Sequence, residues 1–102
     1  MTKSIGTGAL VVVGEGVMGL HRLPPEGEVV VGRSGDVVLR HPSLSRRHLR
    51  LRVGGTVTVE DLGSRHGTVV AGRTLCPGVE QVIAGGELMQ LGCVSIGLVR
   101  AG

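Results

Sequence analysis

Three short segments of the chain carry side chains that suit the binding of a phosphate group. They are G-R-S at residues 32–34, P-S-L-S-R-R-H at 42–48 and D-L-G-S-R-H-G-T at 61–68. Arg33 offers a planar guanidinium fork that matches phosphate oxygens, and Ser45 offers a hydroxyl and a backbone N–H. Arg46 and Arg65 add cationic donors, and the glycines let backbone amides approach an anion closely. If the segments meet in space, they form an oxyanion site.

The elements that must position these segments are short β-strands. Runs rich in branched aliphatic residues are separated by turn material such as Pro-Pro, Ser-Gly, Gly-Gly and Pro-Gly pairs. The pattern predicts strands at residues 9–13, 18–23, 28–32, 37–39, 48–53, 57–61, 68–70, 81–83, 87–91 and 94–99. No segment predicts a helix. Many short strands at short spacing indicate an antiparallel sandwich or barrel.

Such an architecture would bring the three segments together. In a sandwich, loops two strands apart gather at the same end of the sheets. The segments after Gly32, before His48 and after Asp61 are loops of this kind, so we expect them to converge on one ligand.

One hairpin has a register that the sequence determines. Directly opposed residues of an antiparallel pair share a face, so apolar residues must oppose apolar ones around the central Gly-Gly pair. A two-residue loop mixes the faces, whereas a loop of residues 54–56 places Val53 opposite Val57. The same register places Arg50 opposite Glu60 on the outer face, which predicts a structural role for Arg50.

Length and composition limit the class of protein. The 102 residues leave room for one domain, which we place at residues 9–100, with tails at 1–8 and 101–102. The apolar runs are too short for a membrane span or a signal peptide, so we expect a cytoplasmic protein that does not contact a membrane. Two cysteines are too few for a disulfide framework.

A glycine-rich stretch could suggest a nucleotide site. G-E-G-V-M-G at residues 14–19 fits the G-x-G-x-x-G dinucleotide pattern. That pattern needs a helix whose N-terminus faces the pyrophosphate, yet Pro24 and Pro25 follow too soon. We interpret the stretch as a hairpin turn.

Catalytic and metal sites are also weakly indicated. Ser45, His48 and Asp61 could act as nucleophile, base and orienting acid, but no G-x-S-x-G frames the serine. The histidines and cysteines lack the paired spacing of zinc ligands. The sequence therefore predicts no enzyme activity, no metal and no cofactor.

A run of basic residues could suit duplex nucleic acid. No acidic residue lies between Asp36 and Glu60, and the interval contains Arg40, Arg46, Arg47, Arg50 and Arg52. The chain has no Phe, Tyr or Trp for stacking on single strands and no helix to read a groove. We therefore expect nucleic acid to be contacted only through other domains of a parent protein.

The three segments, taken in order, resemble a known family. The order G-R, then S-R-R-H, then D-L-G-S-x-x-G-T is similar to the forkhead-associated (FHA) domain, from about Val29 to Val99. Each motif alone is weak evidence for a family, but the three motifs in this order and at these separations are specific evidence. The resemblance implies an all-β, two-sheet antiparallel sandwich of about eleven strands, with binding loops at one end. It also implies a module that binds a phosphothreonine peptide and performs no catalysis.

The resemblance assigns roles to individual residues. Arg33 matches the family's phosphate-binding arginine, and Ser45 matches the serine that hydrogen-bonds the phosphate. Arg46 follows at a position that contacts the phosphate or the peptide backbone. Three further residues have structural roles in supporting the loops: Gly32, His48 and Gly67.

Two positions depart from the family pattern. Arg65 and His66 stand where the family usually has a small residue and then an asparagine that holds the peptide main chain. Neutral His66 can both donate and accept, although in another geometry, and Arg65 adds a possible charge-assisted bond to the phosphate. Ala71 replaces a further asparagine.

The function that the resemblance implies is phosphothreonine-dependent protein binding in signalling. The partner would be a phosphothreonine protein, in cis or in trans, made by an upstream Ser/Thr kinase. Similar modules in bacteria precede regulatory or enzymatic domains, including those of transcription activators, so we expect such a parent protein. A competing hypothesis is a scaffold or self-association domain with little phosphate dependence, which the changes at His66 and Ala71 favour.

Overall fold

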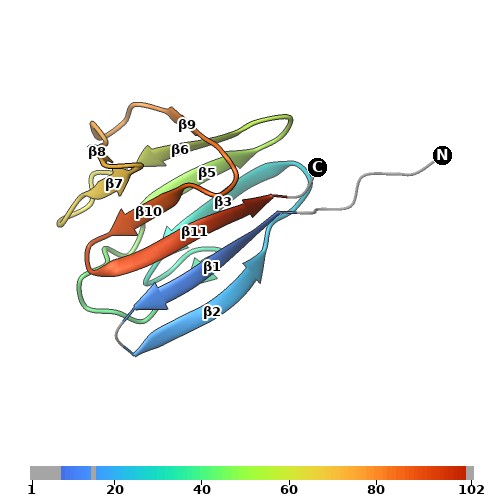
Figure 1. Cartoon of the computed structure of the whole chain (residues 1–102). Coiled ribbons are helices and arrows are strands. Elements are labelled where there is room, and N and C mark those ends of the chain that lie inside the picture. The colour runs from blue at the N-terminus through green and yellow to red at the C-terminus, as the bar shows by residue number, and fades with distance from the viewer. Residues whose placement is uncertain (1–7, 15, 101–102) are drawn as a thin grey trace.

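The structure is a computed structural model that describes residues 8–14 and 16–100, and its eleven strands form two packed sheets (Figure 1). The strands of the six-stranded sheet are, in order, β2 (Val17–Arg22), β1 (Gly8–Gly14), β11 (Val94–Arg100), β10 (Leu88–Leu91), β7 (Thr68–Val70) and β8 (Arg73–Thr74). Those of the five-stranded sheet are β4 (Val37–Val38), β3 (Gly27–Gly32), β5 (Leu49–Val53), β6 (Val57–Asp61) and β9 (Gln81–Ile83). The described residues contain no helix that could cross a membrane.

The expected all-β sandwich is confirmed, with differences of detail. The strand β8 was not predicted, because two exposed residues give no alternation to detect. Strand β1 begins at Gly8, one residue inside the expected N-terminal tail, and β5 begins at Leu49 rather than at His48. The pair β3 and β4 is parallel, unlike the other pairs in the described part of the chain. The remaining residues of the two expected tails lie outside the described residues.

The hairpin of β5 and β6 has the predicted register. Val53 pairs with Val57 and Arg50 pairs with Glu60. The Arg50 guanidinium donates to the Glu60 carboxylate at 2.8 Å, as the cross-strand geometry requires. A three-residue loop is therefore correct, and Arg50 has the expected structural role.

The core lies between the two sheets and is built from branched aliphatic side chains. Alternate residues of each strand point inward, because successive side chains of a strand point to opposite faces. The fully buried members include Leu10, Val12, Val31, Leu49, Leu51, Val57, Val59, Leu91, Ile96 and Leu98. The absence of aromatic residues is offset by this dense set of Val, Leu and Ile.

The glycine-rich stretch after β1 forms the expected hairpin. Gly14 pairs with Val17 across β1 and β2, so a strand follows the turn where a nucleotide site would need a helix. Gly16 lies in the left-handed region, with φ of 74°, which suits a tight turn.

The turn between β7 and β8 contains a strained residue. Val70 pairs with Arg73, so Ala71 and Gly72 form a two-residue loop. Both have positive φ, 49° for Ala71 and 82° for Gly72, as in a type I′ turn. Ala71 is the one non-glycine residue with positive φ among the described residues. Its Cβ makes this conformation unfavourable.

Replacing Ala71 with asparagine should stabilise the domain. Asparagine tolerates the left-handed region because its side chain bonds to the local backbone, so Ala71→Asn should raise the free energy of unfolding by about 0.5–1 kcal/mol. Urea denaturation measures the change. The matched control is Ala84→Asn, at an exposed alanine without positive φ, which should bring no gain. Equal effects of the two substitutions would contradict strain at Ala71.

Candidate functional site

The three segments with phosphate-binding chemistry meet at one end of the sandwich. The backbone N–H of Arg33 donates to the carbonyl of Ser45 at 3.0 Å, and a second bond of 2.9 Å joins the next residue of each loop. The N–H of Leu62 donates to the carbonyl of His48 at 3.0 Å. The loops after β3, before β5 and after β6 therefore adjoin one another, and together they are called the loop end.

His48 lies between two of these loops and is fully buried. Its Nδ1 accepts from the backbone N–H of Ser45 at 3.2 Å, and its Nε2 lies 2.9 Å from the carbonyl of Gly67. Because Nδ1 accepts, Nε2 must carry the proton and donate to Gly67. One neutral imidazole therefore spans from the Ser45 loop to the Gly67 loop.

Burial keeps this imidazole neutral. Desolvation lowers the pKa of His48, and the hydrogen bond to Gly67 and the charge of Asp61 oppose this effect only in part. Protonation would place a second hydrogen on Nδ1 against the Ser45 N–H. The bridge between the loops is thus available to the neutral form alone.

The hydroxyl of Ser45 accepts one hydrogen bond and keeps its own proton available. Its Oγ accepts the backbone N–H of Arg65 at 2.9 Å, which ties the loop after β6 to the loop before β5. The hydroxyl proton has no acceptor among the described residues, and the side chain is only half-buried. An oxyanion at the loop end could therefore accept a hydrogen bond from this hydroxyl.

A buried carboxylate shapes the loop after β6. Oδ2 of Asp61 accepts the backbone N–H groups of Gly63 at 3.0 Å and Ser64 at 2.9 Å. Oδ1 accepts the hydroxyls of Ser64 at 2.6 Å and Thr68 at 2.7 Å. Burial raises the pKa of Asp61, but these hydrogen bonds outweigh it and hold that pKa below its usual range. Asp61 is therefore an ionised structural anchor for the loop.

This role of Asp61 differs from the one considered from the sequence, where it was a possible orienting acid. Ser64 and Thr68 were not predicted as parts of the network around it. The local signal was present, because an aspartate followed two and three residues later by glycine and serine is typical of a turn closed by the carboxylate.

Contact with neighbouring atoms requires one glycine of the loop end and one glycine beside it, in the turn between β10 and β11. A Cβ on Gly32 would lie 2.2 Å from the carbonyl oxygen of Arg46, so no side chain fits there. A Cβ on Gly92 would lie 2.6 Å from Oγ of Ser43, a contact that the sequence did not predict. Gly67 has open space around it but a φ of 80°, which favours glycine for conformational reasons.

Four exposed cationic or titratable side chains surround this framework: Arg33, Arg46, Arg65 and His66. None forms an ion pair with an acidic residue in the described ranges 8–14 and 16–100. Asp61 lies beneath them but is buried and already accepts four hydrogen bonds. The loop end therefore presents unneutralised positive charge to solvent.

The geometry argues against a catalytic triad. In such a triad the serine hydroxyl bonds to the histidine ring, whereas here the Ser45 hydroxyl bonds to Arg65 and only its backbone N–H reaches His48. Nε2 of His48 is 4.0 Å from Asp61 and is used by Gly67. The ring is buried and has no free nitrogen for proton transfer.

Metal binding and nucleic-acid binding gain no support from the structure. Within the part of the chain that the structure describes, no three His, Cys, Asp or Glu side chains cluster as metal ligands would. Of the basic run, Arg50 and Arg52 are paired with glutamates on the outer face of the five-stranded sheet. Arg46 and Arg47, in contrast, lie in the loop before β5.

Comparison with known proteins identifies the family. A model of the FHA domain matches residues 29–92, which is more than half of the chain. The chain belongs to the FHA domain family. A search of curated proteins gave no match.

Solved FHA domains share the whole fold. The FHA domain of the CT664 protein from Chlamydia trachomatis is 27% identical, with a TM-score of 0.83, over 93% of this chain and 98% of that chain. The FhaA FHA domain complexed with the intracellular domain of Rv3910 is 29% identical, with a TM-score of 0.77, over 89% and 98%. A structure from a study of phosphothreonine-dependent FHA domain interactions is 28% identical, with a TM-score of 0.75, over 92% and 98%.

The buried imidazole predicts a specific pH dependence of stability. The unfolded-state pKa of His48 is about 6.5, and the folded-state pKa is lower, so below pH 6.5 the unfolded chain gains a proton that the folded chain resists. The stabilising contribution of neutral His48 to the free energy of unfolding is fully present above about pH 6.5 and is lost as the pH falls. The free energy of unfolding of the wild type should decrease from about pH 7.5 to about pH 5.5 more than that of His48→Gln.

Urea denaturation at several pH values measures both slopes. The other histidines and all carboxylates are present in both proteins, so the difference between the slopes isolates His48. Identical slopes would show that His48 takes up its proton equally in the folded and unfolded states, contrary to the geometry.

Proposed function

We propose that this domain binds phosphothreonine in partner proteins, with the phosphate held at the loop end. The observation that carries the proposal is the junction of Arg33 and Ser45. Their backbones are joined at 3.0 Å, the Ser45 hydroxyl has an uncommitted proton, and the Arg33 guanidinium has no acidic partner among the described residues. Membership of the FHA family, and the similarity to a domain studied for phosphothreonine-dependent interactions, support the same function.

Each residue would have a distinct part in recognition. The Arg33 guanidinium would bind two phosphate oxygens, and the Ser45 hydroxyl would donate to one of them. Arg46 and Arg65 would add positive charge from the two loops on either side, which suits the nearly doubly charged phosphate at neutral pH. The framework of Gly32, His48 and Gly67 would hold these donors in place without touching the ligand.

His66 would contact the peptide main chain beside the phosphothreonine. Its side chain is exposed on the same loop as Arg65. A neutral imidazole can accept a peptide N–H at one nitrogen and donate to a carbonyl from the other, as an amide does with different spacing. Ala71 lies in the turn after β7 and offers no such group, so His66 would be the main contact to the peptide backbone.

The setting follows from the chemistry of the ligand. Phosphothreonine is made by a Ser/Thr kinase, so such a kinase would act upstream of this domain. We place the domain in the cytoplasm, as a regulatory module of a larger bacterial protein such as a transcription activator, with the partner in cis or in trans. Any contact with nucleic acid would be made by other domains of that protein. The domain itself would bind and would not catalyse.

A phosphopeptide library followed by calorimetry tests the proposal. The best phosphothreonine peptide should bind the wild type, and its unphosphorylated form should show no binding. Arg33→Ala should weaken binding by about ten- to a hundredfold, because a hydrogen bond to a charged group contributes about 1.5–3 kcal/mol. Ser45→Ala should weaken it by about tenfold.

The control is Arg22→Ala, which removes the same charge from the far end of β2. It should leave the affinity nearly unchanged. Equal affinity for both forms of the peptide, or equal losses in Arg33→Ala and Arg22→Ala, would refute phosphate recognition at the loop end. That result would favour a scaffold without phosphate dependence.

A further inference from the structure

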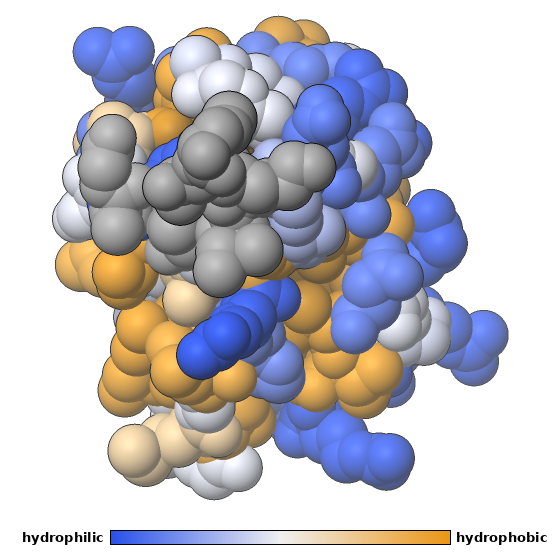
Figure 2. Space-filling view, turned by 90° about the vertical axis from the view of Figure 1, so that its right-hand side faces the viewer, coloured by the Kyte–Doolittle hydropathy of each residue, from blue (hydrophilic) through white to orange (hydrophobic). Residues whose placement is uncertain are grey.

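The outer faces of the two sheets differ sharply in chemistry. The outer face of the five-stranded sheet is covered by ion pairs: Arg50 with Glu60 at 2.8 Å, Arg52 with Glu28 at 3.1 Å, and Arg52 with Glu80. The five-stranded sheet also exposes Val38 and Val82, on its two edge strands. The outer face of the six-stranded sheet carries a larger set of exposed Val, Leu and Met side chains and no such ion pairs among the described residues. Figure 2 shows hydrophobic residues gathered along the lower left of the molecule and hydrophilic ones projecting on the right.

Six residues form this surface, which we call the apolar face. Their exposed fractions are 82% for Met18, 66% for Leu20, 64% for Leu88, 55% for Val13, 50% for Val99 and 37% for Val11. The register places them side by side, because Val13 pairs with Met18, and Val11 pairs with Leu20 on one side and Gly97 on the other. Directly opposed residues share a face, so the six side chains are contiguous across four strands.

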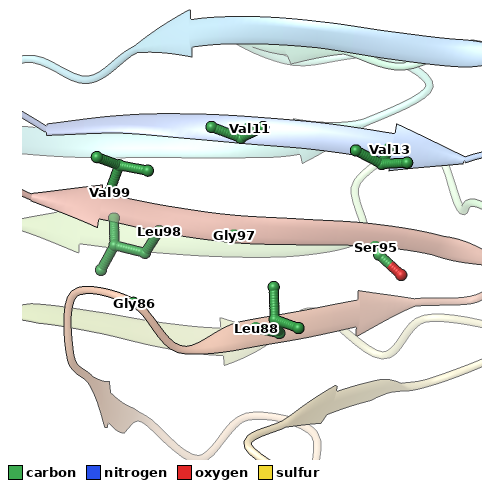
Figure 3. A pocket seen from close by; sticks show the side chains of 8 residues that line it. All are labelled: Val11, Val13, Gly86, Leu88, Ser95, Gly97, Leu98 and Val99. Carbon is green, nitrogen blue, oxygen red and sulfur yellow. The ribbon is translucent and has the colours of Figure 1, made fainter.

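The apolar face contains a depression. Gly97 has no side chain, and Val11 and Val13 of β1 and Leu88 of β10 stand on either side of it (Figure 3). The depression that results has a volume of about 410 Å³. Met18 and Leu20, on the edge strand β2, are the most exposed of the six. In a two-fold dimer the same patch of both subunits meets, so these side chains of one copy would lie against the apolar face of the other.

The apolar face has the features of a protein interface. The six side chains are 37–82% exposed, and together they form a contiguous patch of the kind that marks interaction sites on protein surfaces. A stable complex buries roughly 800 Å² per partner, so the interface would also include the neighbouring Gly97, Ser95 and Gln90.

We propose that the apolar face is a dimer interface and that its occupant is a second copy of this chain, related by a two-fold axis. None of the paired outward positions of the face is charged except Arg22 at its edge, so two copies can meet without burying an unpaired charge. A partner with an ordinary charged surface would have to desolvate charges against hydrocarbon. The apolar face of a second copy is itself uncharged, so it can cover this face without such a cost.

Most of the apolar face lies outside the residues that match the family model. Five of the six residues lie on β1, β2 and β11, outside the matched residues 29–92, and only Leu88 lies within them. The residues proposed for phosphate binding are in the loops at the end of the sandwich, not on this face. A dimer would therefore leave two sites open and could hold a doubly phosphorylated partner through both.

Sedimentation velocity over a range of protein concentrations tests the dimer directly. The wild type should approach twice the monomer mass as its concentration rises. Leu20→Glu and Met18→Glu should each raise the dissociation constant by at least about tenfold, since a two-fold axis buries the new charge twice. Thermal denaturation at low concentration confirms that each variant is folded.

The matched control is Val82→Glu, at a 56% exposed strand residue of the five-stranded sheet. It should dimerise like the wild type. The proposal is overturned if the wild type stays monomeric at every concentration, or if Val82→Glu disrupts the dimer as strongly as Leu20→Glu. Arg33→Ala should also remain dimeric, so failure of phosphate binding and failure of dimerisation would be distinguished.

Discussion

The loop end depends on a buried imidazole that must stay neutral. His48 accepts the N–H of Ser45 at Nδ1 and donates to the carbonyl of Gly67 from Nε2, and burial lowers its pKa so that this state persists. The Ser45 hydroxyl adds a second link between the same loops by accepting the N–H of Arg65. Because the Ser45 amide is fixed by the ring, the hydroxyl of the same residue is held in one place at the surface. The position of the half-buried Ser45 hydroxyl thus depends on a buried residue just before β5.

Around this bridge, the loops are organised by groups that also stay out of the site. The Asp61 carboxylate closes the turn after β6 by accepting four hydrogen bonds, and Gly32 admits the Arg46 carbonyl where any side chain would collide. The cationic side chains are left exposed and without acidic partners among the described residues. On the five-stranded sheet, by contrast, Arg50 and Arg52 are paired with glutamates. Arginines are therefore paired with carboxylates on the sheet, whereas those of the loop end stay available for the phosphate recognition that we propose.

Much of this could be predicted from the sequence, and the limits have physical causes. The alternation of Leu51 and Val53 with charged residues determined a strand and its register, because only one loop length keeps the faces apart. The two-residue strand β8 is too short to show alternation. The ionic pairing of Arg52 with Glu28 depends on which strands become neighbours, and local pattern does not contain that information.

At the loop end, too, some features could be predicted from local sequence and others depend on contacts between distant residues. The order of the motifs indicated which segments should meet, and they do meet. The close approach of Gly92 to Ser43 was not predictable, because it joins residues far apart in the chain through the packing of the two sheets.

NMR of ¹⁵N-labelled protein titrated with a phosphothreonine peptide tests the account most directly. We predict shifts confined to the amides of Ser45, Arg46 and Arg65, the guanidinium of Arg33 and the imidazole of His66, with His48 remaining the neutral Nε2–H tautomer. A charged or Nδ1–H imidazole, or shifts centred away from these loops, would contradict it.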